Sequence, residues 1–451
     1  MQYKKIKKLF SNDFFRAMVI LTSGTAFAQA LNIIALPLIT RLFSPQEFGA
    51  FAIFVTLFSI VGGIASLRYE IAIPLAISDD EAANVFGIAL ICALVTSTVI
   101  FIIITLFGSK IAYLINSPQL NPYLWLLPIT VLAGSVYSIF HYWAIRKKYF
   151  SQIASSTIDQ SIIGVSVQIL LGLLGFGIIG LLLGHTAKVG AGSFRIAKKM
   201  MSDSRDAIKQ ITPKELLKVA RVYDRYPKYS TFDVLANSVS IQAPIIFIAA
   251  KAGIVEVGLL ALAMKVMQTP LTLIGSSVGK VYYSQAVEEN SKGHLDALTI
   301  KVLSMLAKVG VGPIIFLGIL SPSAVGFVFG DEWTRAGELI RWMTPWFVMQ
   351  FLSSPISMSL HIIGRQKTLL GLTIFGLAIR VAFIFGALSF FGVNSLSESY
   401  AISGAVFYSI CLLIFSHYAG LKKYDFLKVI ISSTPIILLW VFLALTILYF
   451  I

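Results

Sequence analysis

Apolar runs of about 20 residues recur along nearly the whole chain, separated by short polar or charged links. This is the length at which an α-helix crosses a lipid bilayer, so the pattern predicts an all-α polytopic membrane protein. The thirteen expected spans lie near 14–38, 47–66, 82–107, 122–145, 155–174, 177–194, 231–251, 255–279, 302–321, 336–362, 368–391, 399–419 and 429–451. The link between the fifth and sixth spans is short, so counts of 12 and 14 stay open.

Composition supports this class. Hydrophobic residues make up 57% of the 451 positions and charged residues 13%, whereas soluble domains have about 25% charged residues. The first residues, MQYKKIKKLF, lead into a run too long for a signal peptide and indicate a retained first helix. Cys92 and Cys411 lie in different apolar runs and indicate neither a disulfide framework nor a metal site.

The positive charges predict the topology. With the N-terminus in the cytoplasm and residues near the ends of spans counted with the adjoining side, 27 of the 36 Lys and Arg residues lie inside, five lie outside and four lie deeper within spans. This asymmetry is what the positive-inside rule predicts. The net charge of +15 is thereby explained by topology, and no nucleic-acid partner is expected.

A basic segment divides the chain into four expected parts. These are a six-helix lobe at 1–194, a basic cytoplasmic linker at 195–230, a second six-helix lobe at 231–420 and an additional C-terminal membrane helix at 421–451. Within the linker, Thr212, Pro213 and Glu215 have the pattern of an N-cap, first helical position and capping-box partner. They predict an amphipathic helix near 213–224 at the inner membrane surface.

The two lobes contain a faint internal repeat. Gln29 and Gln242 open comparable spans, and Glu47-Phe48-Gly49 resembles Glu256-Val257-Gly258 across the outer turn. Six crossings separate the copies, so they share one orientation about an axis along the membrane normal. Paired lobes of this kind enclose a central cavity.

Ionisable residues inside the spans are the candidate functional groups. Lys188, Lys265, Lys308 and Arg380 outnumber the acids, so a cavity lined by them would attract an anion such as a phosphate or pyrophosphate. The competing interpretation, strongest for Lys308 and Lys188, is that long side chains reach the headgroups from the lipid face. Asp159 is either a structural partner of a lysine or, like Glu70, a carrier of a coupling ion.

Uncharged polar residues in the spans complete the candidate site. Gln29 and Asn32 share a helix face in the first span, and Asn237 and Gln242 lie in the seventh. Such amides bind sugar hydroxyls or pack helices together. Pro37, Pro244, Pro270, Pro313 and Pro355 predict kinks. Enzyme motifs such as GxxxxGK[ST] and HExxH are absent from the sequence, and we expect neither catalysis nor a cofactor or metal.

Several stretches resemble one family. They include GTAFAQALNIIALPLITRLFSPQEFGAFAIF, LRYEIAIPL, RKKYF, YDRYPKYSTFDVLANSVSIQAPIIFIA, GLLALAMKVMQTPL and FGDEWTRAGELIRWMTPW. In this order they are similar to the Wzx-type polysaccharide flippases of the multidrug/oligosaccharidyl-lipid/polysaccharide exporter superfamily. The resemblance implies two six-helix bundles around a cavity that opens to one side at a time.

The resemblance also implies a function. The expected substrate is an oligosaccharide repeat unit on undecaprenyl pyrophosphate, moved from the inner to the outer leaflet of the bacterial cytoplasmic membrane for O-antigen or capsule assembly. Expected partners are membrane lipids and, in the pathway, a polysaccharide polymerase and glycosyltransferases. Lys188, Lys265 and Arg380 would bind the pyrophosphate and acidic sugar groups. The alternatives are a multidrug cation antiporter of the same superfamily and a non-transporting scaffold for polysaccharide assembly.

Overall fold

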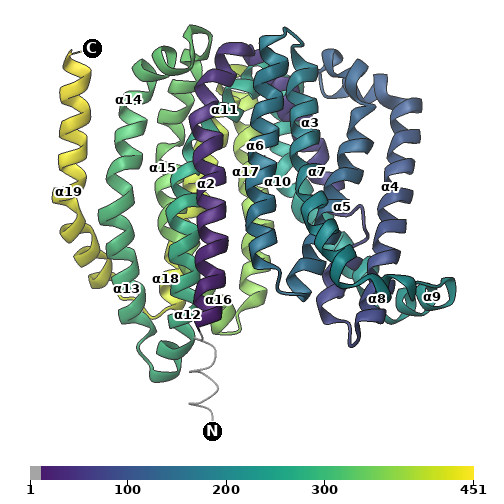
Figure 1. Cartoon of the computed structure of the whole chain (residues 1–451). Coiled ribbons are helices and arrows are strands. Elements are labelled where there is room, and N and C mark those ends of the chain that lie inside the picture. Colours follow the sequence, from purple (N-terminus) through teal and green to yellow (C-terminus); the bar gives the residue numbers. More distant parts are fainter. Residues whose placement is uncertain (1–11, 451) are drawn as a thin grey trace. The chain divides into compact units, whose positions relative to one another are not determined.

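The computed structural model describes residues 12–450, and every regular element in this range is a helix (Figure 1). The all-α class is therefore confirmed. Each predicted apolar run overlaps a long helix or consecutive helices, although the runs at 47–66 and 122–145 include turns at 63–66 and 124–125. Ile451 lies outside the described residues. The longer helices of the first half are α2 (Asn12–Leu42), α3 (Pro45–Gly62), α4 (Asp79–Leu114), α5 (Leu126–Arg146), α6 (Phe150–Leu173), α7 (Ile178–Asp203) and α10 (Thr231–Ala252).

The second half follows the same pattern with shorter helices between the spans. Its helices are α11 (Ile254–Pro270), α12 (Ser276–Lys292), α13 (Leu295–Leu306), α14 (Gly312–Phe329), α15 (Thr334–Ile356), α16 (Met358–Ile362), α17 (Gln366–Phe390), α18 (Leu396–Tyr418) and α19 (Lys423–Phe450). In the described chain, eleven helices are long and apolar enough to cross a membrane. Of the predicted spans, those at α7 and α15 are not among these eleven, and both helices combine charged residues with other polar ones.

The chain forms two compact units. The N-terminal unit comprises the chain up to Phe43 together with Ala50–Ile246, and the C-terminal unit comprises Ser44–Gly49 and Phe247–Ile451. The helices α3 and α10 each begin in one unit and end in the other. The predicted division into two lobes, a linker and an additional helix stays a prediction.

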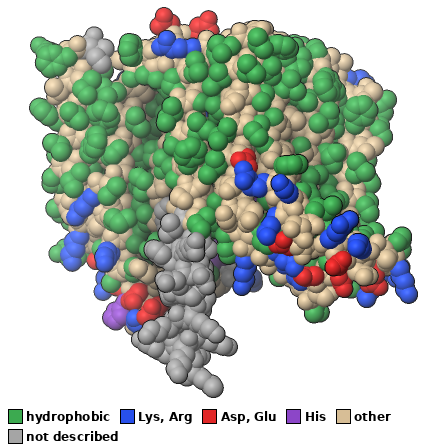
Figure 2. Space-filling model, in the orientation of Figure 1, with side chains coloured by type: hydrophobic (Ala, Val, Ile, Leu, Met, Phe, Trp, Pro, Cys, Tyr) green, Lys and Arg blue, Asp and Glu red, His purple; other side chains and the backbone are tan. Residues whose placement is uncertain are grey.

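The outer surfaces of the helices are apolar. Large hydrophobic side chains are exposed on many of them, and on α19 Leu439 and Phe442 are 66% and 70% exposed. On the face drawn in Figure 2, hydrophobic side chains are widespread and many of the charged ones gather toward the lower margin. Exposed apolar surface of this extent is unfavourable in water and is expected where helices face lipid.

Two predicted kinks coincide with widened helical turns. Pro270 ends α11 and is followed by a π-turn, Leu271–Gly275, before α12. Pro313 opens α14 directly after another π-turn, Ala307–Val311. A proline ring collides with the carbonyl four residues earlier, which for Pro313 belongs to Val309 within the widened turn. The π-turn accommodates the ring without breaking the span.

The basic segment at 195–230 is folded onto the N-terminal unit. It contains the end of α7, α8 (Arg205–Lys209) and α9 (Pro213–Val222). Thr212 caps α9 as predicted, accepting a bond from the Glu215 amide at 3.4 Å. The return bond of a capping box is not formed, because the Thr212 amide donates to Asn84 Oδ1 at 3.2 Å. Val219 is 3% exposed within a cluster that includes Ile73 and Phe86.

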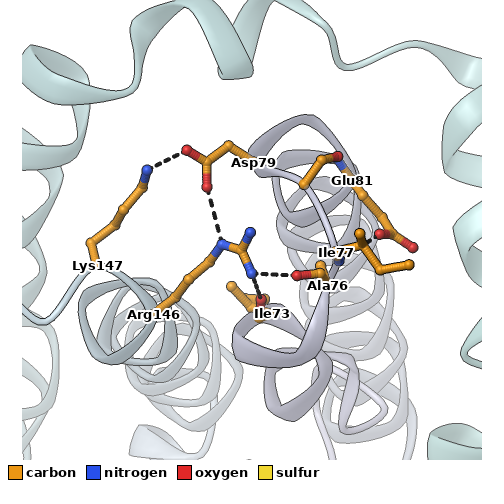
Figure 3. Close-up of polar contacts among 8 residues, drawn as sticks. Ile73, Ala76, Ile77, Asp79, Glu81, Arg146 and Lys147 are labelled. Atoms are coloured by element: carbon orange, nitrogen blue, oxygen red, sulfur yellow. Dashed lines mark hydrogen bonds and ion pairs between the residues drawn. The ribbon is translucent and has the colours of Figure 1, made fainter.

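Arg146 holds the segment between the 3₁₀-helix Tyr69–Leu75 and α4 in place (Figure 3). Arg146, at the end of α5, donates to the carbonyls of Ile73 and Ala76 at 3.3 and 2.6 Å and pairs with Asp79 at 3.2 Å. Lys147 also pairs with Asp79. The guanidinium therefore binds carbonyls at the end of the 3₁₀-helix Tyr69–Leu75 through Nη1 and a carboxylate at the start of α4 through Nε, whereas a lysine would have to make all of these bonds from one nitrogen.

We expect Arg146→Gln to lower the free energy of unfolding by about 2 kcal/mol, because charge-assisted hydrogen bonds contribute about 1.5–3 kcal/mol. The thermal unfolding midpoint of the purified protein in detergent measures the effect. Lys148→Gln removes the same charge from an exposed side chain two residues away and should leave the midpoint within about 1 °C of wild type. Equal losses in the two variants would show that charge alone matters here.

Candidate functional site

Lys188 lies in α7 and its ammonium group reaches α2. The Nζ atom donates to Asn32 Oδ1 at 3.2 Å, and Asn32 Nδ2 donates to the Ala28 carbonyl at 2.6 Å and to Ser161 Oγ of α6 at 3.0 Å. The structure thus brings together two of the predicted ligands, Lys188 and Asn32, in the N-terminal unit. It adds Ser161, which is 3% exposed.

A glycine makes room for the lysine. A Cβ at Gly164 would lie 2.7 Å from Lys188 Cβ and 3.1 Å from its Cδ. The aliphatic stem therefore runs along the surface of α6, which determines where the ammonium group lies. A larger side chain at position 164 would push it aside, so the glycine is part of the geometry of this site.

Arg380 lies in α17 of the C-terminal unit and packs on an aromatic ring of α18. Its guanidinium carbon is 5.3 Å from the centroid of Phe407. Its Nε atom is buried and has no hydrogen-bond partner within the described chain. Stacking on a ring stabilises the cation but leaves N–H donors available for an anion.

The other predicted cations and amides lie on different helices. Lys265 of α11 has an exposed side chain, and Lys308 is half-buried in the π-turn Ala307–Val311. Asn237 is exposed on α10, while Gln242 and Gln29 are half-buried. Within the described chain, the side chains of Lys308, Asn237, Gln242 and Gln29 make no hydrogen bond or ion pair. Their role in substrate binding stays a prediction.

The two candidate ion carriers are both paired with arginine. Asp159 of α6 accepts two bonds from Arg195 of α7, at 2.6 and 3.0 Å. Glu70, 2% exposed, accepts from Arg68 at 3.1 Å and from Ser66. An arginine donates charge-assisted hydrogen bonds to a carboxylate and offsets its negative charge. This geometry favours structural ion pairs at both positions.

Ser161, Arg195 and Phe407 were missed by the sequence reasoning. Arg195 stands 36 residues from Asp159 and Ser161 stands 129 residues from Asn32, so no local spacing announces either contact. A helical spacing does relate Gly164 to Ser161, which are three residues apart and share one face of α6. This was the one available signal, and it indicates a face without naming what the face contacts.

The electrostatic balance of these groups is positive. The acids named above are neutralised by arginines, whereas Lys188 contacts an amide oxygen and Arg380 an aromatic ring. Within membrane-embedded helices, such cations require a polar environment. The arrangement can bind an anion.

Comparison with known proteins identifies relatives. Residues 38–338 match the family described as polysaccharide biosynthesis protein. The succinoglycan biosynthesis transport protein ExoT of Rhizobium meliloti (strain 1021) is 23% identical over 320 residues. This match covers 69% of the chain and 61% of the relative, so it spans less than two thirds of the relative's length.

Solved structures share the fold. The lipid II flippase MurJ in an inward closed conformation has a TM-score of 0.71 and 15% identity, covering 95% of this chain and 93% of MurJ. An inward-facing multidrug resistance transporter of the MATE family has a TM-score of 0.66 and 16% identity, covering 90% and 96%. A transporter of the MOP superfamily from Pyrococcus furiosus, described as having a binding pocket of reverse polarity, has a TM-score of 0.59, 15% identity and coverage of 89% and 95%.

These matches agree with the resemblance seen in the sequence. The structural likenesses, at 15–16% identity, establish the fold, and the family match extends over more than half of the chain. The chain belongs to the polysaccharide biosynthesis protein family and has the fold of the MOP superfamily of transporters.

Proposed function

We propose that the protein is a flippase for oligosaccharide repeat units linked to undecaprenyl pyrophosphate. It moves them from the inner to the outer leaflet of the bacterial cytoplasmic membrane, with its own N-terminus in the cytoplasm, for assembly of a surface polysaccharide such as O-antigen or capsule. Lys188, Lys265, Lys308 and Arg380 bind the pyrophosphate and acidic sugar groups during transport. Gln29, Asn32, Asn237 and Gln242 bind sugar hydroxyls.

The observation that carries the proposal is the lysine at position 188. It lies between helices of an apolar bundle and donates to the Asn32 amide oxygen at 3.2 Å, while Asp159 is already paired with Arg195. Burying a cation in such a setting raises the free energy of the protein unless an anion binds to it. Because its partner is an amide, the lysine can exchange this hydrogen bond for a phosphate oxygen without leaving a carboxylate unpaired.

Lys188→Met tests this proposal. We expect export to fall about tenfold, because a charge-assisted hydrogen bond to a phosphate contributes about 1.5–3 kcal/mol and each 1.4 kcal/mol is a factor of ten. The thermal midpoint should stay unchanged or rise, since methionine fills a similar volume without a charge to desolvate. Cells that lack the chromosomal copy and express each variant are assayed for surface polysaccharide and for accumulated lipid-linked repeat units.

Matched variants make the test specific. Lys188→Arg keeps the charge and should retain most export, and Lys301→Met removes a charge from an exposed side chain of α13 and should be silent. Normal export by the Lys188→Met protein would contradict the role of this residue in binding the pyrophosphate.

The multidrug antiporter and the scaffold predict different results. An antiporter for cationic drugs needs acids exposed to its substrate. If the protein is such an antiporter, Lys265→Ala with Arg380→Ala, which removes two cations, would alter drug resistance and leave surface polysaccharide intact. A scaffold requires that the same double variant export normally while deletion of the gene abolishes the polymer. Loss of the polymer with unchanged drug resistance supports the flippase.

A further inference from the structure

A polar pocket outside the proposed transport site lies at one end of the α6–α7 pair. It has a volume of about 320 Å³ and is lined by Ser151, Gln152 and Ser155 of α6 and by Arg195, Lys198, Lys199 and Ser202 of α7. Three cations and four uncharged hydrogen-bonding groups thus face one small space. Their chemistry is suited to an oxyanion.

The charges around the pocket do not cancel. Arg195 pairs with Asp159 at 2.6 Å, and Lys199 pairs with Asp203 at 2.8 Å. Hydrogen bonds from Lys199 and from Tyr149, the latter at 2.9 Å, hold the pKa of Asp203 below its ordinary value. Lys198 has no carboxylate partner within the described chain, so one positive charge is left over.

The α6 side of the pocket also has unused donors. The side chains of Ser151, Gln152 and Ser155 make no hydrogen bond to any described residue, and the first turn of α6 has no side-chain cap. The positive end of the α6 dipole therefore adds to the potential of Lys198. A ligand with a single negative charge would match the excess and use these donors.

The surroundings indicate that the ligand is amphiphilic. Phe194 and Met201 flank Lys198 on the same side of α7, four residues before it and three after it, and they are 79% and 59% exposed. A free phosphate ion makes no favourable contact with these apolar side chains, whereas the acyl chains of a lipid pack against them. α6 is one of the helices long and apolar enough to cross a membrane and begins at Phe150, so Ser151, Gln152 and Ser155 lie at the end of a span, where lipid headgroups are expected.

We infer that this pocket binds the phosphate of an anionic membrane lipid, with Lys198 as the main cation and Ser151, Gln152 and Ser155 as hydrogen-bond donors. The bound lipid would connect the beginning of α6 to the last turns of α7, where the basic segment starts. The inference is independent of the proposed transport function, because its ligand is an ordinary phospholipid and its residues differ from those of the transport site.

The experiment uses the full-length protein purified in lipid-free detergent. It is titrated with dioleoylphosphatidylglycerol, with dioleoylphosphatidylcholine or with sodium phosphate, and binding is followed by native mass spectrometry and by the thermal midpoint. We expect saturable binding and a raised thermal midpoint with phosphatidylglycerol, and neither effect with phosphatidylcholine or sodium phosphate. Lys198→Gln should weaken this binding about tenfold, and Lys198→Arg should restore it.

Lys214→Gln is the matched control. Lys214 is an exposed lysine of α9, outside the pocket, and its replacement changes the net charge equally, so phosphatidylglycerol binding should not change. Equal weakening by Lys214→Gln, or no weakening by Lys198→Gln, would overturn the inference. An equal rise in midpoint with sodium phosphate would overturn the assignment to a lipid.

Discussion

Gly258→Ala is expected to destabilise the C-terminal unit by about 3 kcal/mol. A Cβ at this position would lie 1.9 Å from the Pro45 carbonyl oxygen and 2.8 Å from the Gly49 amide nitrogen. Both atoms belong to the backbone at the start of α3 and cannot rotate away. The helices would have to separate, which disturbs the buried contact of Phe48 with Trp333, whose ring centroids are 5.1 Å apart.

The first copy of the repeat, which contains Gly49, forms the same crossing reciprocally. A Cβ at Gly49 would lie 1.9 Å from the Ile254 carbonyl oxygen, so each glycine faces the residue that stands four positions before the other. The likeness between Glu47-Phe48-Gly49 and Glu256-Val257-Gly258 thus coincides with a close approach of the two segments. Gly49→Ala should therefore match Gly258→Ala in its effect.

Thermal unfolding and the fraction of monodisperse protein after solubilisation measure both variants. Gly371→Ala in α17 is the control, because a Cβ there meets no atom within 4 Å and alanine is the better helix former by about 0.8–1.0 kcal/mol. It should be neutral or slightly stabilising. A wild-type midpoint for Gly258→Ala would mean that the two helices can separate at little cost.

Arg335→Met is expected to lower the free energy of unfolding by about 3 kcal/mol. Arg335 of α15 pairs with Glu338 at 2.6 Å, with Glu256 of α11 at 3.5 Å and with Glu398 of α18. The side chains of Glu256 and Glu398 are 18% and 16% exposed. Removing the cation leaves these carboxylates unpaired, which costs about 3–5 kcal/mol for a buried pair. The lower end applies because the arginine is 32% exposed.

The second measurement is a rescue. Arg335→Met combined with Glu398→Gln should recover part of the lost midpoint, since one of the uncompensated charges is then gone. Arg341→Met, which removes an exposed arginine from the same helix, should change the midpoint by no more than about 1 °C. If the double variant is no more stable than Arg335→Met, unpaired charge is not the cause of the loss.

The sequence supported the helical architecture almost completely. Runs of about 20 apolar residues have one solution in a bilayer, because lipid offers no hydrogen bonds to the backbone. The helix at Pro213–Val222 was also predicted, because the residues that cap it, Thr212 and Glu215, lie within its first turn and can be recognised from local sequence. Lys188 and Asn32 were recognised as candidates because polar groups are rare in spans, but their contact was not, because 156 residues separate them.

By itself, then, the amino-acid sequence determined the helical class, the positions of the apolar helices and the identity of the cations within them, all of which follow from composition over a few turns. The tertiary structure decided which charges meet: it paired Asp159 with Arg195 and left Lys188 on an amide. It also placed Gly49 and Gly258 at a crossing of two backbones. These outcomes depend on how each helix is rotated and how closely it packs on its neighbours, and side chains distant in sequence determine both.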